Sequence, residues 1–225
     1  METMKLRTCE MRICTSCGLR YPLIKDGNAG FRCPACLGDT ILDNSHAMCR
    51  DQDRKEVDRK PTNFRILLDN IRSGFNVGSI LRTAEGFGVE HAYLCGITPN
   101  PEERAVQKTE LGASSQIHWS HHRNAVELAT KLKSEGWVIL GLETEATAAP
   151  ISQITISAPH VGAAGFVLTV GNEIAGIDPA LLHLCTGVYC IPLKGSKHSI
   201  NVAVAFGIAA YLLASIHQHP VSGNA

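Results

Sequence analysis

The sequence predicts an α/β domain, in which helices flank a parallel β-sheet, and a small cysteine-rich domain before it. From residue 63 onward, short apolar runs alternate with helical patterns, which is typical of βαβ units. Most of these runs lack the polar alternation of a half-exposed strand, which indicates strands buried on both faces of a sheet. Residues 1–60 hold few large apolar side chains but two pairs of closely spaced cysteines, so a conventional core is not expected there.

The composition is that of a globular protein with one good-sized core and a small appendage: 225 residues, of which 44% are apolar. Net charge is zero, and residues 1–60 hold 11 of the 21 basic and 9 of the 21 acidic side chains. A nucleic-acid partner would therefore be bound by local basic patches. The longest apolar run, 202–214, is shorter than the roughly 20 residues that span a bilayer, and the N-terminus has no apolar signal core. We expect a cytoplasmic protein without a membrane partner, its nine cysteines reduced.

The N-terminal segment contains two C-x2-C pairs, Cys14 with Cys17 and Cys33 with Cys36, separated by 15 residues. This spacing predicts a four-thiolate zinc site in a zinc-ribbon-like domain covering residues 1–50. Metal binding would supply the folding energy that the sparse apolar content cannot. A redox dithiol and four unrelated thiols are the alternatives, and three further residues are possible substitute ligands: Cys9, Cys49 and His46.

A charged linker is predicted at residues 51–62, because eight of the ten residues in 51–60 are charged and Pro61 follows them. The α/β domain then spans 63–225. Its expected strands lie at 64–71, 91–97, 137–143, 165–171 and 187–193, with helices at 76–87, 123–135 and 178–185 and a last helix from Ser199.

Three loops follow predicted strands, where parallel sheets bind their ligands: SGFNVGS (73–79), GNEIAG (171–176) and KGSKHS (194–199). Taken singly, each has an ordinary explanation. Asn76 and Ser199 are residue types that cap helices, Arg82 stands three residues from Glu85 on a helix, and Glu173 suits an exposed loop. The conjunction of the three loops favours a binding site.

Taken together, three motifs resemble the signatures of the SpoU/TrmH family of RNA 2′-O-ribose methyltransferases, part of the SPOUT superfamily. They are N-x5-R in NVGSILR, G-x-E-x-x-G in GNEIAG and I-P-x-x-G-x3-S-x-N in IPLKGSKHSIN, and the segments LRTAEGFGV and KTELGASS are similar to the family's too. The resemblance covers about residues 63–217. It implies a parallel sheet with a C-terminal deep trefoil knot, a homodimer, S-adenosyl-L-methionine bound in the knot, and tRNA or rRNA as the partner.

The resemblance also implies the site residues. The catalytic group would be Asn76, Arg82, Glu173, Ser199 and Asn201, and the cofactor would be lined by Leu142, Gly171, Ile191, Ser199 and Ile200. No catalytic metal is needed. A guanidinium stays protonated, so we expect Arg82 to bind a phosphate or orient the hydroxyl, with His198 as the alternative proton acceptor.

The helix expected from Ser199 is apolar nearly all round, so it must be buried on more than one side. The resemblance implies that one side packs on the sheet and another joins a dimer interface, while its polar first turn faces the active site.

The zinc-ribbon-like segment has two interpretations: it contacts RNA, or it is a structural or protein-contact module. The residues suited to phosphates and unpaired bases are Arg12, Arg20, Lys25, Arg32, Tyr21 and Phe31. For the whole chain, the alternatives to an RNA methyltransferase are a non-catalytic RNA-binding scaffold and a nicotinamide-dependent oxidoreductase. The second is disfavoured because no G-x-G-x-x-G follows a strand. The pair His121 and His122 is expected on the surface.

Overall fold

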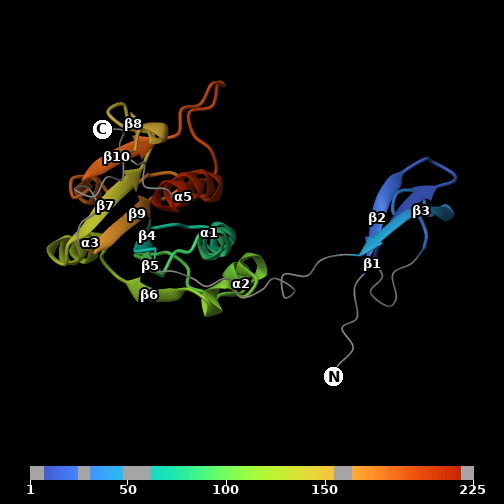
Figure 1. Cartoon of the computed structure of the whole chain (residues 1–225), viewed down its shortest axis with the longest axis horizontal. Helices are drawn as coiled ribbons and strands as arrows, with labels where there is room; N and C mark the ends of the chain where they lie inside the picture. The colour runs from blue at the N-terminus through green and yellow to red at the C-terminus, as the bar shows by residue number, and fades with distance from the viewer. Residues whose placement is uncertain (1–7, 25–30, 48–61, 155–163, 219–225) are drawn as a thin grey trace. The chain divides into compact units, whose positions relative to one another are not determined.

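The computed structural model describes residues 8–24, 31–47, 62–154 and 164–218, and the chain divides into two compact units, 1–58 and 59–225 (Figure 1). The predicted linker, 51–62, lies outside the described residues except for Thr62, and so do Lys25 and Cys49. Among the described residues, no helix combines the length and apolar character needed to cross a membrane.

The first unit is a three-stranded antiparallel sheet in the order β2-β1-β3, formed by β1 (Thr8–Cys14), β2 (Arg20–Ile24) and β3 (Thr40–Ala47). Its interior is polar: Arg12 and Glu10 form a buried ion pair at 2.8 Å, and Arg12 also donates to the Thr40 hydroxyl and carbonyl. Buried Cys9, Cys14 and Cys33 supply most of the remaining core.

The second unit is a seven-stranded, fully parallel sheet in the order β6-β5-β4-β9-β7-β10-β8 (Figure 1). All five predicted strands are present. The seven strands are β4 (Phe64–Asp69), β5 (His91–Cys95), β6 (His118–His122), β7 (Trp137–Leu142), β8 (Ala149–Pro150), β9 (Gly165–Val170) and β10 (Gly187–Cys190). Sequence patterns missed β6, which reads HWSHH and has no apolar run, and β8, which has two residues.

Among the described residues, five α-helices cover the sheet, and four of them correspond to predicted helices. They are α1 (Gly74–Gly86), α2 (Arg104–Glu110), α3 (Ala125–Ser134), α4 (Pro179–Leu182) and α5 (Val202–Gln218), with 3-10 turns at Ala113–Ser115 and Ile151–Gln153. Patterns missed α2, which is short and buries only Val106 and Glu110. The expectation that the last helix begins at Ser199 is wrong: it begins at Val202, because the Asn201 side chain caps it.

The sheet is buried on both faces, as its apolar strands predict. Ile66 and Leu68 of β4 pack with α1 and α5 on one face, whereas Leu67 faces the cluster that contains α3 and α4 on the other. On α5, Phe206, Ala209, Ala210 and Leu213 are fully buried. Because every strand runs in the same direction, the loops after β4, β7, β9 and β10 gather at one edge.

Candidate active site

The loop after β4 brings Asn76 into the first turn of α1. Ser73 is the N-cap, since its hydroxyl accepts a hydrogen bond from the Asn76 backbone N–H. Asn76 therefore does not cap this helix, and its side-chain amide is free to point out of the first turn. That amide donates to the Glu173 carboxylate at 2.9 Å.

The loop after β9 is a tight closed turn. Asn172 and Gly176 exchange two backbone hydrogen bonds of 2.9 Å, and the side-chain oxygen of Asn172 accepts from the Ile174 and Ala175 N–H groups. The side-chain amide nitrogen of Asn172 donates to the Asn70 carbonyl at 2.7 Å, which ties this loop to the end of β4. At Gly171 any side chain would collide with the backbone of the same turn. The sequence GNEIAG thus builds a rigid support for Glu173.

Glu173 joins two of the three loops. Its carboxylate accepts from the Arg72 N–H at 2.9 Å, the Ser73 N–H at 3.0 Å and the Asn76 amide. The N–H groups at the start of α1 have no partner within the helix, and the helix dipole favours a negative charge there. Burial pushes the pKa of Glu173 up, but the hydrogen bonds outweigh burial and lower it below its ordinary value. The carboxylate is therefore ionised at neutral pH.

The third loop, between β10 and α5, reaches the same point through Asn201. Its side-chain oxygen accepts from the Ala203 and Val204 N–H groups, which fixes the direction of the amide nitrogen. That nitrogen donates to the Asn76 side-chain oxygen at 3.0 Å. Glu173, Asn76 and Asn201 thus form one hydrogen-bonded chain between segments that lie far apart in the sequence.

A cavity of about 470 Å³ lies beside this chain of hydrogen bonds. Its lining includes all five residues that the sequence analysis assigned to a cofactor, Leu142, Gly171, Ile191, Ser199 and Ile200, together with Glu173 and Asn201. No lysine or arginine lines it, whereas the carboxylates of Glu143 and Glu173 do. The cavity is mixed in character, with apolar walls and a few polar groups, as small-molecule sites commonly are.

Sequence patterns missed Glu143, which directly follows β7. Its carboxylate accepts from the Ile177 N–H at 2.9 Å and the Thr144 N–H at 2.8 Å, so it fastens the loop after β9 to the end of β7. Its position directly after a buried strand could have marked it as a candidate site residue, because the other loops of the site also follow strands.

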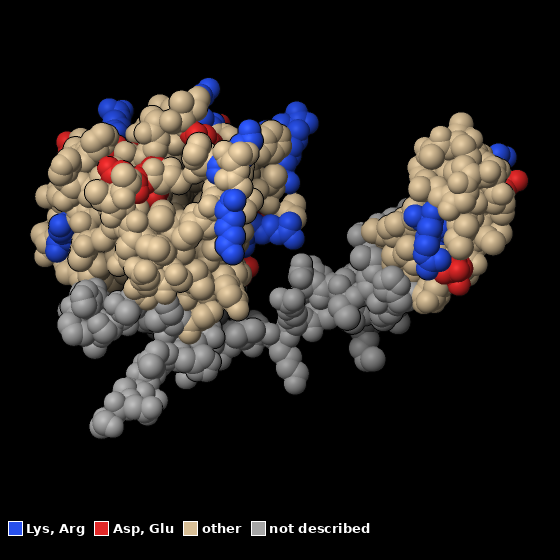
Figure 2. All heavy atoms as spheres, turned by 90° about the horizontal axis from the view of Figure 1, so that it is seen from above, with Lys and Arg blue, Asp and Glu red and all other residues tan. Residues whose placement is uncertain are grey.

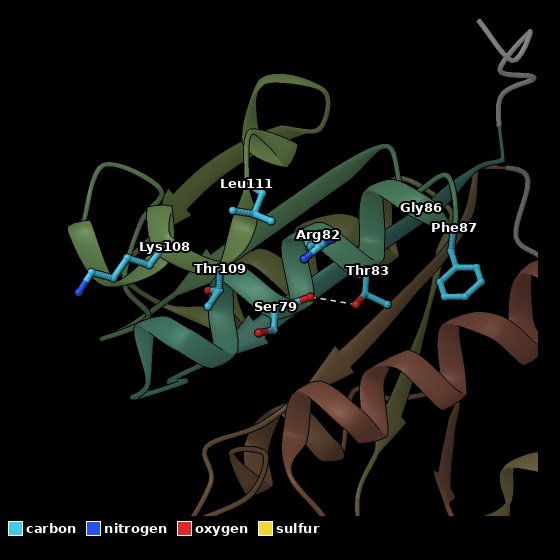
Figure 3. Close-up of a pocket in the computed structure, with 8 residues that line it drawn as sticks. All are labelled: Ser79, Arg82, Thr83, Gly86, Phe87, Lys108, Thr109 and Leu111. Atoms are coloured by element: carbon cyan, nitrogen blue, oxygen red, sulfur yellow. Dashed lines mark hydrogen bonds between the residues drawn. The ribbon is translucent and has the colours of Figure 1, made fainter. Parts of the chain in front are cut away.

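Of the predicted catalytic residues, three line the cavity: Glu173, Ser199 and Asn201. Asn76 does not line it but is hydrogen-bonded to Glu173 and Asn201, whereas Arg82 neither lines the cavity nor joins these hydrogen bonds. It lies two turns further along α1, in a separate groove with Lys108 and Leu111 (Figure 3). Figure 2 shows Lys and Arg in several separate groups, most of them toward one side of the larger unit, which agrees with local basic patches.

The histidine pair is only partly on the surface. His121 is exposed, but His122 is half-buried and lies 2.8 Å from the Ser120 hydroxyl, which is also 2.8 Å from His91. Burial, with nearby Arg65, lowers the pKa of His91 to about 4, so this histidine is neutral. Within the described residues, the only cluster with the geometry of a metal site is formed by cysteines.

Cys14, Cys17, Cys33 and Cys36 lie together, with all four sulfurs within 4.8 Å of one another. The Cys14 and Cys36 sulfurs are 3.5 Å apart and those of Cys17 and Cys33 are 3.7 Å apart. Tetrahedral zinc with Zn–S bonds of about 2.3 Å requires separations of about 3.8 Å. Backbone N–H groups of Ser16 and Cys17 donate to Cys14, and the Cys17 hydrogen bond is the main cause that lowers the pKa of Cys14 to about 6. The donor set fits zinc.

Of the arginines expected to contact RNA from this unit, Arg12 is buried, whereas Arg20 and Arg32 make exposed ion pairs. Arg12 pairs with Glu10, Arg20 lies 2.6 Å from Asp43, and Arg32 lies 3.8 Å from Asp39. Phe31 is 56% exposed and carries the Arg12 guanidinium over its ring at 5.0 Å. Burial therefore removes Arg12 from the residues that could contact RNA, whereas exposed Arg20, Arg32 and Phe31 fit either interpretation of the cysteine-rich unit.

Comparison with known proteins shows which family the second unit resembles. The model of the SpoU rRNA methylase family matches residues 63–211. The chain is 32% identical over 148 residues to 23S rRNA (guanosine(2553)-2'-O)-methyltransferase RlmP of Bacillus subtilis, a match covering 66% of this chain and 56% of the relative. It is 25% identical over 153 residues to tRNA (guanosine(18)-2'-O)-methyltransferase of Escherichia coli K12, covering 68% and 63%. The chain therefore spans less than two thirds of either relative.

A solved structure has the same fold. The AdoMet-bound rRNA methyltransferase from Sinorhizobium meliloti superposes with a TM-score of 0.63 at 24% identity, covering 73% of this chain and 60% of that one. Residues 1–62 precede the part of the chain matched by the family model.

Proposed function

Because residues 63–211 show that this chain belongs to the SpoU rRNA methylase family, we propose that it transfers a methyl group from S-adenosyl-L-methionine to a ribose 2′-hydroxyl of tRNA or rRNA. The observation that carries this proposal is the convergence of the three motif loops on one cavity through Glu173, Asn76 and Asn201.

The cavity suits a cationic cofactor. S-adenosyl-L-methionine, when bound, supplies an electrophilic methyl group on a positively charged sulfonium. The carboxylates of Glu143 and Glu173 offer the complementary charge, and Leu142, Ile191 and Ile200 offer apolar surface for a flat ring. The proposal includes the trefoil knot, in which the segment between β10 and α5 threads through a loop.

The side chains around the cavity would act by positioning. Asn76 and Asn201 hold each other, and Glu173 fixes Asn76 against the start of α1, so the polar groups need no rearrangement when a ribose arrives. Ser199 lines the same cavity and offers a hydroxyl to the substrate. Holding two reactants in line accounts for about 7–11 kcal/mol of a barrier in favourable cases. Arg82 would bind a phosphate of the RNA through its planar guanidinium.

Removing His198 is expected to leave the pH dependence of methyl transfer unchanged. His198 is exposed in the loop before α5, and within the described residues no hydrogen bond orients its ring. The pH–rate profiles of His198→Ala and Arg82→Ala check this: Arg82→Ala should lower the rate at every pH. If the ascending limb of the pH–rate profile were lost in His198→Ala and kept in Arg82→Ala, the histidine would be identified as the proton acceptor.

The proposal extends to a homodimer in the cytoplasm. One side of α5 carries Val204, Ile208 and Tyr211, which are 54%, 38% and 60% exposed and stand at i, i+4 and i+7. An apolar stripe of this kind at helical spacing suits burial against a second copy. In the first unit, the four cysteines would hold one structural Zn²⁺.

Calorimetric titration of the full chain with S-adenosyl-L-methionine tests the proposed function. We expect one site per chain, with no heat of binding from a nicotinamide dinucleotide. Val202→Trp, which fills the cavity from α5, should abolish the binding, and Lys131→Ala on α3 should not. Uptake of the nicotinamide instead would identify an oxidoreductase, and binding of RNA without the methyl donor would identify a scaffold.

A further inference from the structure

A buried carboxylate stands at the end of β4, beside the candidate active site. Asp69 is the last residue of this strand and is 1% exposed. Its two oxygens accept separate hydrogen bonds: Oδ2 from the Asp178 N–H and Oδ1 from the Asn70 side-chain amide, each at 2.8 Å. Asp69 does not line the cofactor cavity, so any part that it takes in the reaction is indirect.

Burying Asp69 costs free energy, because its charged form loses hydration. Burial raises the pKa of Asp69, and the like charge of Asp178 adds to the rise, while the two hydrogen bonds oppose it. A neutral asparagine would avoid the cost but would offer one acceptor oxygen in place of two. What the carboxylate supplies is a pair of acceptors for two donors on different segments, and this geometry favours a positioning role over a purely stabilising one.

Asn70 carries the effect of Asp69 to the loop after β9. Its side-chain nitrogen donates to Asp69 and its side-chain oxygen accepts from the Ile97 N–H at 3.2 Å, so both ends of the amide are fixed. The φ of Asn70 is 55°, a left-handed conformation that asparagine tolerates, and it turns the chain at the end of β4. The Asn70 carbonyl then accepts from the side chain of Asn172, which closes the loop that carries Glu173.

Asp69 and Glu173 each hold the segment that carries the other. β4 and β9 are neighbouring parallel strands, so the segments that follow them lie side by side (Figure 1). Glu173, after β9, accepts from the N–H groups of Arg72 and Ser73, which lead into α1. Asp69, at the end of β4, accepts from the N–H of Asp178, which leads into α4. We call these hydrogen bonds the Asp69–Glu173 clasp.

Building on the methyl transfer proposed above, we propose that Asp69 is a positioning residue for that reaction and acts through Glu173. Asp69 sets where the loop after β9 lies against the start of α1. Glu173 passes that position on to Asn76, and Asn76 to Asn201, through the hydrogen bonds between their side chains. Without the Asp69–Glu173 clasp the chain keeps its fold, but the two asparagines lose their alignment.

Asp69→Asn is the principal test, because it keeps the size of the side chain and replaces one acceptor oxygen by an amide nitrogen. Either the Asp178 N–H or the Asn70 amide then faces another N–H group. We expect kcat for methyl transfer to RNA, at saturating S-adenosyl-L-methionine, to fall about 10-fold, since the loop should shift by less than the displacement of about 1 Å that costs about 100-fold.

Asn70→Gly is the second variant. It removes the amide that links Asp69 to the Ile97 N–H, it keeps the carbonyl that accepts from Asn172, and glycine adopts a φ of 55° readily. Because Asp69 keeps its bond from the Asp178 N–H, we expect a smaller loss of kcat, about 3-fold.

A double-mutant cycle shows whether Asp69 acts through Glu173. In the Glu173→Ala background the carboxylate that Asp69 positions is gone, so adding Asp69→Asn should lower kcat by less than about 2-fold. A residue that only stabilised the fold would lower the rate by the same factor in both backgrounds. An equal loss of kcat in the two backgrounds would therefore overturn the proposal.

Leu132→Ala is the control for a general loss of stability. Leu132 is 2% exposed near the end of α3, which precedes the first residue of β7 and so lies away from the strand ends that carry the site. A cavity there lowers the free energy of unfolding. At a temperature where thermal unfolding shows every variant folded, Leu132→Ala should keep the wild-type kcat. A loss as large as that of Asp69→Asn would make Asp69 a structural residue only.

The pKa of Glu173 supplies a readout that needs no methyl transfer. Although burial raises this pKa, the hydrogen bonds outweigh burial and hold it below its ordinary value. If the loop withdraws from the start of α1 in Asp69→Asn, these hydrogen bonds lengthen and the pKa of Glu173 rises toward its ordinary value. Carbon NMR titration of the side-chain carboxyl in the full chain measures it, and Leu132→Ala should match the wild type.

The two readouts separate this inference from the proposed function. A wild-type chain that binds no S-adenosyl-L-methionine and transfers no methyl group ends the proposed function, whereas a raised Glu173 pKa in Asp69→Asn would still support the Asp69–Glu173 clasp. An active wild type whose kcat and Glu173 pKa are unchanged by both Asp69→Asn and Asn70→Gly ends the positioning role alone.

Discussion

Glu173→Ala is expected to lower the rate of methyl transfer about 100-fold. The substitution removes the acceptor of three hydrogen bonds and leaves two N–H groups at the start of α1 without their partner. The Asn76 amide then loses its anchor, and with it the orientation that Asn201 relies on. A misplacement of about 1 Å in a reacting pair costs about this factor. The measurement is kcat with saturating S-adenosyl-L-methionine and RNA.

Glu145→Ala supplies the matched control. Glu145 is an exposed carboxylate in the loop after β7, outside the cavity lining, and within the described residues its side chain accepts no hydrogen bond. It should keep wild-type activity. Glu173→Gln should fall between the two, because one of its amide hydrogens would face the Arg72 N–H. A Glu173→Ala enzyme within threefold of the wild type would show that the hydrogen-bonded chain does not organise the reaction.

Removing zinc is expected to unfold the first unit and leave the second unit folded. The first unit has a buried ion pair and cysteines where larger domains have apolar cores, so we expect a metal bound by the four cysteines to supply most of its stability. Structural zinc sites contribute about 10–16 kcal/mol of apparent binding free energy in small zinc domains. We expect one zinc per chain by elemental analysis, and loss of the β1–β3 amide signals in NMR spectra after chelation.

Cys33→Ser should reproduce the effect of the chelator, because Cys33 is fully buried in the cluster. Cys185→Ser is the control: Cys185 is half-buried in the second unit, and its thiol donates to the Leu181 carbonyl. A metal-free protein that keeps the three-stranded sheet folded would contradict the structural role of zinc.

The buried strands were predictable because a strand covered on both faces needs an unbroken apolar run, as FRILLD and GFVLTV show. The strand β6 was not predictable, because HWSHH has no apolar run and lies at the edge of the sheet, where polar side chains are tolerated. The start of α5 was misplaced for a local reason. Ser199 and Asn201 are both good N-cap types, and only the folded loop shows that the Asn201 oxygen accepts from the first turn.

For the site, the motif resemblance named candidate catalytic residues but could not say where each side chain lies. Asn76 and Arg82 stand six positions apart on α1, which places them about 120° apart around the helix axis at 3.6 residues per turn. Helical geometry alone therefore separates the asparagine from the arginine, and the structure places Arg82 in the separate groove with Lys108 and Leu111. The buried ion pair between Glu10 and Arg12 could not be predicted, because charged residues at alternate positions of a strand usually face water.

The most direct test of this account is the position of the transferred methyl group. The full chain would be incubated with isotope-labelled S-adenosyl-L-methionine and RNA lacking ribose methylation, and the nucleosides of the digested RNA would be separated by mass spectrometry. The account predicts label on the 2′-oxygen of one ribose, in a dinucleotide that resists alkali, and no label with the Glu173→Ala variant. Label on a base, or no transfer to either tRNA or rRNA by a protein that binds the donor, would contradict it.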